Sequence, residues 1–251
     1  MSTHDTATGY DALPRIRRLD GARLMVEASY HDPVRTNERP GDGAARGTAR
    51  MEAFADAVFA IAFTLPLVEI ALPRGGVGFG LRLVELWPAY LGYVLASLVI
   101  GIYWVHHHFS GAIYRTTGHY FNLATVLFLA AIGFIAFPAR AFAENINDPA
   151  SRGTGALFFA GGLFVTSLAW LIKWTVGRKS GHVDDRLDKT YVAKLDRRYR
   201  TSTLLTGIGA ILAVAEWRIG LFLCLSILLG YLRAPRTPLY RSVAPAIEGE
   251  G

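Results

Sequence analysis

The sequence has a single cysteine, Cys224, so no disulfide bond can form within the chain. Charged residues are scarce, at 18% of 251 residues, and most of them lie in residues 1–50, 177–200 and 233–251. The chain has no nucleophile elbow, no glycine-rich phosphate-binding loop and no dinucleotide-binding fingerprint. These absences exclude a disulfide-stabilised scaffold. They also mean that nothing in the sequence supports an enzymatic function or a bound cofactor.

Long apolar runs fill the chain between the charged blocks, and hydrophobic residues make up 52% of it. A bilayer core about 30 Å thick needs about 20 predominantly apolar residues per spanning helix. The sequence therefore predicts an all-α integral membrane protein with six transmembrane helices. The predicted spans are residues 53–72, 86–105, 120–139, 156–176, 201–215 and 219–232. The last two are predicted to form a hairpin, because one helix through both would be about 48 Å long.

The distribution of basic residues predicts the orientation of these spans. With the N-terminus inside, the inner segments hold twenty of the 26 Lys and Arg residues and the outer segments hold five. Such an excess is typical of cytoplasmic loops. The sequence thus predicts a cytoplasmic, disordered tail over 1–49, a transmembrane domain over 50–232 and a cytoplasmic tail over 233–251. The net charge of +6 has this topological explanation, so nucleic acid is not an expected partner.

Two features of the fourth span carry further expectations. Lys173 lies near its inner end, where a long side chain can extend its charged group to the membrane surface. The pair Gly161-Gly162 predicts a close contact with another helix, because small residues let two helix backbones approach each other.

One narrow strip of the first span contains Ala57, Ile61, Thr64 and Val68, which fall within about 60° at 100° per residue. The strip is apolar apart from one hydroxyl group. It could pack against another helix or against lipid. Facing a symmetry axis, the same strip would line a narrow pore with hydrophobic constrictions and one polar ring. Periodicity alone does not distinguish between these alternatives.

Polar residues gather at the inner ends of the first two spans. Asp56 lies about one turn inside the membrane boundary. Its carboxylate could be stabilised by the positive end of the helix dipole, could support a pore, or could do both. His106, His107 and His108 are adjacent, and neighbouring residues on a helix point about 100° apart. Because they cannot converge on one metal ion, we expect one of them to hydrogen-bond to Asp56 or Asn122 instead.

The first span resembles the first-helix signature of the bacterial transmembrane protein 175 family. The family pattern is Arg-x-x-x-Phe-Ser-Asp, and the matching residues here are Arg50-x-x-x-Phe54-Ala55-Asp56, followed by Ala-Val-Phe-Ala-Ile-Ala-Phe-Thr-Leu. Further along the chain, the supporting matches are Trp104-x-x-His107-His108, Asn122 and Phe137-Pro138. The resemblance covers about residues 50–140.

Members of this family are potassium-permeable channels related to the lysosomal potassium channel. The resemblance implies a homotetramer in the lipid bilayer of the cell membrane, without enzymatic activity, in which the first helix of each subunit lines the pore. The implied pore-lining residues, in contact with potassium ions, are Ile61, Thr64 and Val68. The resemblance also implies a network that joins the inner ends of the first three helices. Its members would be Arg50, Phe54, Asp56, Asn122 and His107 or His108.

Two residues depart from the family pattern. Ala55 stands where the family has Ser, so the network loses a hydroxyl group. Pro66 stands in the pore helix where the family usually has Leu, and it is expected to remove one backbone hydrogen bond and to bend the helix. As the resemblance implies, the carbonyl-lined filter sequence Thr-Val-Gly-Tyr-Gly is absent.

Two other functions compete with a channel. In a proton-coupled or small-solute transporter, Asp56 and the adjacent histidines would relay protons. In a structural membrane subunit, the same residues would only hold helices together, and the protein would carry out no transport of its own.

The charge distribution generates a test of the topology. Reporter fusions at Gly251 and within residues 143–153 should give opposite signals, because six spans place the C-terminus inside and this loop outside. A reporter that is active only in the cytoplasm makes the measurement. Identical signals at the two positions would contradict the six-span arrangement.

Overall fold

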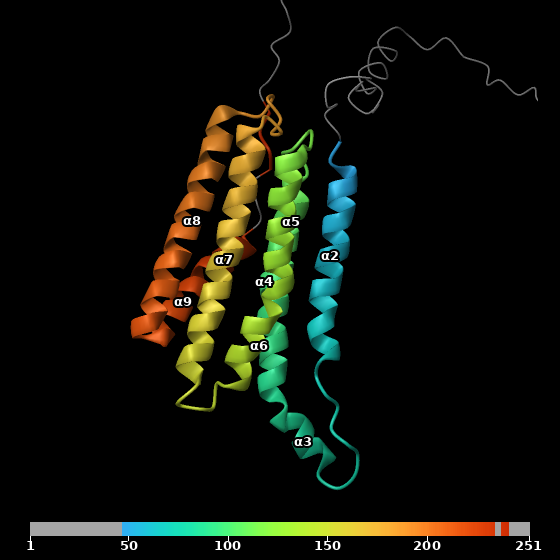
Figure 1. Ribbon diagram of the computed structural model, residues 1–251, viewed down its shortest axis with the longest axis vertical. Coiled ribbons are helices and arrows are strands. Elements are labelled where there is room, and N and C mark those ends of the chain that lie inside the picture. Colours follow the sequence, from blue (N-terminus) through green and yellow to red (C-terminus); the bar gives the residue numbers. More distant parts are fainter. Residues whose placement is uncertain (1–46, 234–236, 241–251) are drawn as a thin grey trace, which may run out of the picture.

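The computed structural model describes residues 47–233 and 237–240, and Figure 1 shows an elongated bundle whose long helices run side by side. The described residues form helices joined by loops and two isolated β-bridges, so the predicted all-α class is confirmed. The helices are α2 (Ala49–Val68), α3 (Phe79–Glu85), α4 (Trp87–Ser110), α5 (His119–Phe134), α6 (Ala136–Glu144), α7 (Arg152–Lys179), α8 (Lys189–Ala215), α9 (Trp217–Leu229) and the 3-10 helix η2 (Gly230–Leu232). Most of both predicted tails lies outside the described residues.

Within the described part of the chain, four helical stretches are long and apolar enough to cross a membrane. α2, α4 and α7 supply one each, and α5 together with α6 supplies the fourth. These stretches overlap the first four predicted spans. The last two predicted spans fall in α8, whose first half is charged, and in α9, which has 13 residues. Six transmembrane helices therefore stays a prediction.

The end of the third predicted span differs from the structure. The predicted span over 120–139 ends just after Phe137-Pro138, but α5 ends at Phe134 and α6 then continues to Glu144. Pro138 is the third residue of α6, within the first helical turn. In that turn a backbone N–H group has no partner inside the helix, so a proline is tolerated. This proline lies near the start of a helix and does not end one.

α8 and α9 form a hairpin at the predicted position. Glu216 separates the two helices, and its carboxylate accepts a hydrogen bond from the backbone N–H of Arg218 at 3.1 Å. The helices come closest at Gly209 and Gly220. A Cβ atom on Gly220 would collide with the backbone of Gly209 and of Ala213. Glycine is required here because the two backbones touch.

The Gly161-Gly162 pair makes the predicted helix contact at one of its two positions. A Cβ atom on Gly162 would already lie 2.9 Å from Pro138 Cγ and 3.0 Å from Ile135 Cδ1, so α7 packs closely on α6. A Cβ atom on Gly161 would have no described atom within 4 Å. Gly161 therefore faces away from the neighbouring helices of the same chain.

Lys173 does not extend to the membrane surface, so that prediction is wrong. The residue is 1% exposed, and its Nζ lies 2.7 Å from His107 Nδ1. The ammonium group also lies over the rings of Trp170, Tyr114 and Phe128, at 4.8, 5.6 and 5.6 Å from their centroids. α7 continues beyond this residue, and the aromatic rings enclose its side chain and attract its charge.

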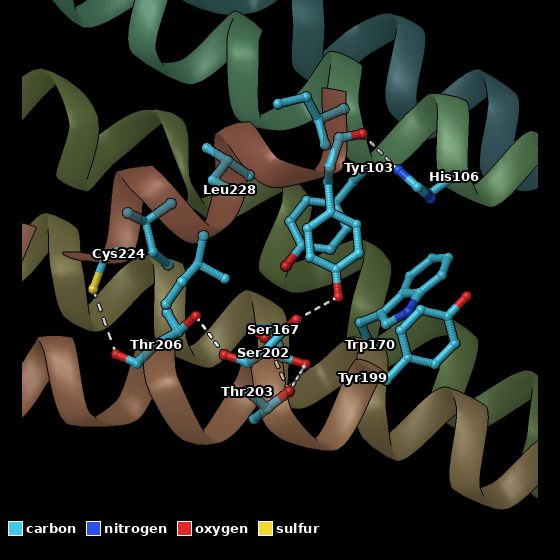
Figure 2. A pocket seen from close by; sticks show the side chains of 14 residues that line it. Tyr103, His106, Ser167, Trp170, Tyr199, Ser202, Thr203, Thr206, Cys224 and Leu228 are labelled. Carbon is cyan, nitrogen blue, oxygen red and sulfur yellow. Dashed lines mark hydrogen bonds between the residues drawn. The ribbon is translucent and has the colours of Figure 1, made fainter. Parts of the chain in front are cut away.

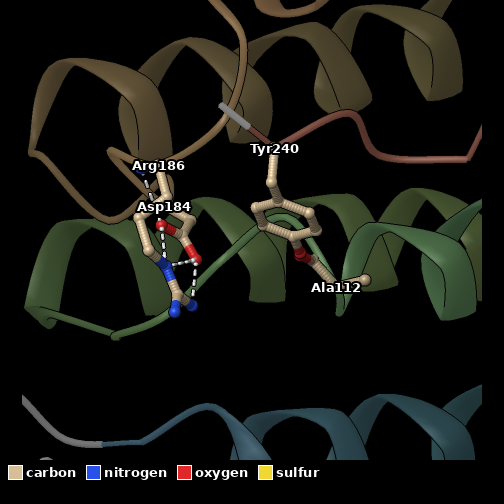
Figure 3. A network of polar contacts seen from close by, with 4 residues as sticks. All are labelled: Ala112, Asp184, Arg186 and Tyr240. Atoms are coloured by element: carbon tan, nitrogen blue, oxygen red, sulfur yellow. Dashed lines mark hydrogen bonds and ion pairs between the residues drawn. The ribbon is translucent and has the colours of Figure 1, made fainter. Parts of the chain in front are cut away.

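The end of the described chain returns to two loops of the bundle (Figure 3). The Tyr240 hydroxyl donates a hydrogen bond to the Ala112 carbonyl, in the loop after α4, at 3.0 Å. The Arg186 guanidinium, in the loop after α7, lies 5.8 Å from the centroid of the Tyr240 ring. The same guanidinium hydrogen-bonds to Asp184 and holds the pKa of that carboxyl below its ordinary value. These contacts fasten the chain end to both loops.

The close approach at Gly220 predicts a difference between two substitutions. Gly220→Ala should lower the free energy of unfolding by about 1–3 kcal/mol, because the added methyl group meets backbone atoms that no rotamer change can move. Gly161→Ala should be neutral or stabilising by up to about 1 kcal/mol, because its surroundings are open and alanine favours a helix. Unfolding of the purified protein in detergent measures both. Equal effects would contradict the close contact.

Candidate functional site

α2 lies at one flank of the bundle and packs on α4 and α5 (Figure 1). Its buried residues, Ala55, Phe59 and Ala62, recur at the spacing of one helix face. Phe59 is 2% exposed, and its ring centroid lies 5.6 Å from that of His107 and 6.1 Å from that of Phe128. The two small alanines allow the neighbouring helices to approach. This packing fixes the rotation of α2 about its own axis.

The predicted strip of α2 lies on the face opposite this packing. At 100° per residue, the centre of the strip is about 160° away from the centre of the buried face. Ile61 is 56% exposed, Val68 is 76% exposed, and Ala57 and Thr64 are exposed as well. Within one chain most of the strip is therefore uncovered, and Ile61 borders a hollow that it shares with Gly133 of α5 and with α6. Lipid and other copies of the chain remain as its neighbours.

Thr64 supplies the polar group of the strip. Its hydroxyl donates within the helix, to the carbonyl oxygens of Ala60 at 3.0 Å and Ile61 at 3.2 Å. The hydroxyl hydrogen is thus used internally, and the lone pairs of Oγ1 stay available on the exposed face. The Phe63 side chain is turned toward α4, because its ring makes an edge contact with Tyr93, with the ring centroids 6.5 Å apart.

An ion pair fastens the C-terminal end of α2 to α6. The Arg140 guanidinium donates to Glu69, just beyond α2, at 2.8 Å and to Glu144 at 2.7 Å. About half of each side chain is exposed, so the pair contributes about 0–1 kcal/mol to stability. α2 itself continues beyond Pro66 and ends at Val68. The expected bend at this proline stays a prediction.

Asp56, in the N-terminal half of α2, is hydrogen-bonded to α4. The indole N–H of Trp104 donates to Asp56 Oδ1 at 3.1 Å, and the Trp104 ring stacks on His108 with centroids 5.8 Å apart. This partner differs from the histidine that we expected, because the indole occupies the side of α4 that faces Asp56. Through this bond, the carboxylate ties the N-terminal half of α2 to α4.

The three adjacent histidines point to three different partners. His106 Nε2 donates to the carbonyl of Tyr231 at 2.8 Å, and His107 Nδ1 accepts from the Lys173 ammonium. His108 stacks on a tryptophan of its own helix. Their divergence follows from the 100° spacing of neighbouring residues on a helix. His107 alone of the three contacts the buried face of α2.

The other members of the predicted network lie on the surface of the single chain. Arg50 and Asn122 are exposed, and Phe54 is 54% exposed. In the region that the structure describes, no side-chain hydrogen bond joins any of the three to Asp56. Their part in a network stays a prediction.

A narrow pocket lies on the other side of the bundle, between α4, α7, α8 and α9 (Figure 2). Four of its hydroxyl groups are paired with one another: Ser167 lies 3.0 Å from Thr203, and Tyr231 donates to Ser202 at 2.7 Å. The enclosed space is about 30 Å³, which is enough for about one water molecule. This polar region links helices and offers no path for an ion.

Three residues outside the predicted set hold α2 and its neighbours in place: Trp104, Arg140 and Lys173. The signal for Lys173 was present in the sequence, as a single cation inside an otherwise apolar span and three residues after Trp170. Trp104 occurs in the quoted motif, but the motif gives no partner for it. Arg140 and its partner are 71 residues apart, and no local pattern connects them.

Comparison with known proteins gives consistent similarities. Residues 50–136 match the family described as endosomal/lysosomal potassium channel TMEM175. A potassium channel of Chamaesiphon minutus is 33% identical over 162 residues, which are 61% of this chain and 77% of that protein. A potassium channel of Streptomyces collinus is 31% identical over 144 residues, 56% of this chain and 70% of that one. The crystal structure of a lysosomal potassium-selective channel TMEM175 homologue from Chamaesiphon minutus matches with a TM-score of 0.64 and 27% identity, over 75% of this chain and 98% of that chain. These findings confirm the family resemblance.

The hydrogen bond between α2 and α4 predicts non-additive effects. Asp56→Ala and Trp104→Phe should each lower the free energy of unfolding by about 0.5–1.5 kcal/mol, because each removes the same bond. The double variant should then lose clearly less than the sum of the two. Asp56→Asn keeps an acceptor oxygen and is the matched control. Additive losses in chemical unfolding would contradict the bond.

Proposed function

The chain belongs to the TMEM175 family of potassium channels. We therefore propose that it conducts potassium ions passively across a cell membrane. The proposal is supported by its relatives from Chamaesiphon minutus and Streptomyces collinus, which are named potassium channels. It is further supported by four helical stretches of the described chain that suit a bilayer. The function proposed is that of a channel and involves no chemical reaction.

In the proposed assembly, four copies form a homotetramer with their α2 helices around a central pore. The observation that carries this arrangement is the exposure of Ile61, Thr64 and Val68 on the face of α2 opposite its packed face. α2 also lies at the flank of the bundle, so four copies can bring it to a shared axis without rearranging the other helices (Figure 1).

The strip would then set the resistance of the pore. Rings of four Ile61 and four Val68 side chains are hydrophobic constrictions, which hinder ions by excluding water. A ring of four Thr64 hydroxyl groups lies between them. Because each hydroxyl hydrogen is bound to a carbonyl of its own helix, the oxygen lone pairs are free to coordinate a potassium ion.

The proposed topology has six spans, with both termini cytoplasmic. Residues 50–232 form the channel domain, and residues 1–49 and 233–251 form the cytoplasmic tails. α8 has 27 residues and is about 40 Å long, so its charged first half reaches the cytoplasmic surface while its apolar second half crosses the membrane with α9.

One observation favours a second candidate, a proton-coupled transporter. Lys173 and His107 form a buried pair of titratable groups beside α2, which is the type of arrangement that can relay protons in a membrane protein. The candidate differs from the channel in a measurable way, because its cation flux would depend on a proton gradient.

Purified protein in potassium-loaded liposomes distinguishes the two functions. A channel gives potassium efflux that is driven by the potassium gradient alone and is proportional to the driving force. Efflux that saturates and requires a proton or sodium gradient would favour the transporter. The absence of flux above that of protein-free liposomes would contradict both.

Cysteine substitutions locate the ion path. In a Cys224→Ser background, a thiol-reactive cation should block flux through Ile61→Cys and Thr64→Cys. Phe63→Cys should be insensitive, because Phe63 is turned toward Tyr93 of α4. Ile61→Asn should raise sodium leak, since a polar ring admits water where a hydrophobic ring does not. Block at Phe63→Cys without block at Ile61→Cys would show that another face of α2 lines the path.

A further inference from the structure

α8 forms the edge of the bundle on the side away from α2 (Figure 1). It packs on α7 and α9 through a face that contains Tyr199, Thr203, Thr206 and Ala213. The opposite face of α8 is exposed along the whole helix. In the proposed channel, with α2 around the axis, this face is directed outward to the membrane lipid.

The exposed face of α8 changes from basic to apolar along the helix. Besides Arg200, which is paired with Asp196, its first half exposes three basic side chains, and its second half exposes large apolar ones. These residues are Lys189, Lys194 and Arg197, followed by Leu204, Ile208 and Ile211. The apolar residues are 65%, 40% and 72% exposed, so the described chain leaves each of them accessible.

The three basic side chains are available for an external anion. In the described part of the chain, no ion pair joins Lys189, Lys194 or Arg197 to a carboxylate. The other two cations of this half are engaged within the protein. Arg200 Nε lies 2.8 Å from Asp196, and the Arg198 guanidinium lies 4.2 Å from the centroid of the Tyr231 ring.

Arg197 and the apolar groups follow each other on one line. At 100° per residue, Arg197, Leu204 and Ile208 lie within about 40° of one another, and Arg197 is about 10 Å from Leu204 along the axis. Lys189 and Lys194 lie on either side of this line. A phospholipid has the same order, with a phosphate at the membrane surface and acyl chains below it. We propose that this face of α8 binds an anionic phospholipid of the cytoplasmic leaflet, with its phosphate at Arg197 and the two lysines flanking it.

The chemistry of the face favours an anionic lipid over other partners. Basic side chains near a membrane surface attract anionic headgroups, whereas a zwitterionic headgroup carries its own cation and gains less. Long Lys and Arg side chains can reach the phosphate level while their stems stay in the apolar region. A nucleic acid or an acidic peptide would leave the apolar half of the face uncovered.

Lipid retention by the full-length protein tests the proposal. The channel is reconstituted with equal amounts of phosphatidylglycerol and phosphatidylcholine, extracted in mild detergent, and its bound lipids are counted by native mass spectrometry. The wild-type protein should retain phosphatidylglycerol preferentially. The triple variant Lys189→Gln, Lys194→Gln, Arg197→Gln should lose at least about tenfold of this preference. The matched control Lys189→Arg, Lys194→Arg, Arg197→Lys keeps the charge and should keep the preference.

Three outcomes would overturn the proposal: an unchanged preference in the triple Gln variant, a loss in the charge-conserving control, or displacement of the lipid by inorganic phosphate at constant ionic strength. The last would indicate a site for a free anion. The unfolding midpoint in phosphatidylcholine alone shows whether the triple Gln variant is folded. If the triple variant does not fold, the single variants Lys194→Gln and Arg197→Gln are measured instead. Because lipid retention needs no conduction, it can fail while potassium flux persists.

Discussion

Phe59 packs between α4 and α5 against the ring of His107, and this contact determines which way the remainder of α2 faces. Behind His107, the Lys173 ammonium donates to its Nδ1 atom, so α7 supports the histidine from the side opposite α2. Toward its two ends, α2 is further held by the bond from Trp104 and by the ion pair between Arg140 and Glu69. With one face held in this way, the strip that contains Ile61 must face outward.

A lysine inside an apolar bundle would ordinarily be costly, because its ammonium group loses its hydration. Here the hydrogen bond to His107 and the faces of three aromatic rings offset that cost. The bond also fixes the histidine, since Nδ1 accepts from the ammonium and the ring proton therefore resides on Nε2. A buried pair of this kind is expensive to break, because removing one partner leaves the other unpaired. It consequently specifies how α4 and α7 align beneath α2.

The sequence was sufficient to predict the four apolar helical stretches and the residues of α2 that share one strip, because both follow from local composition and from the 100° spacing. It was not sufficient for the contacts between helices. Lys173 was expected at the membrane surface, since nothing local shows that aromatic rings from α5, from α7 and from the loop after α4 surround it. Asp56 was expected to bind a histidine, since the motif does not show that Trp104 reaches it first. Pro138 resembled a helix end, although its meaning depends on where the next helix starts.

If the exposed strip of α2 faces a shared axis, the four copies of this strip lie close together, and distances between subunits measure this. Spin labels are attached at Ile61→Cys, or at Ile211→Cys on α8, in a Cys224→Ser background in lipid bilayers, and the distances between labels are measured by pulsed dipolar spectroscopy. Four α2 helices around a pore predict clearly shorter distances at position 61 than at position 211, because α8 forms the opposite edge of the bundle. Shorter distances at position 211 would place α8 at the axis and contradict the account.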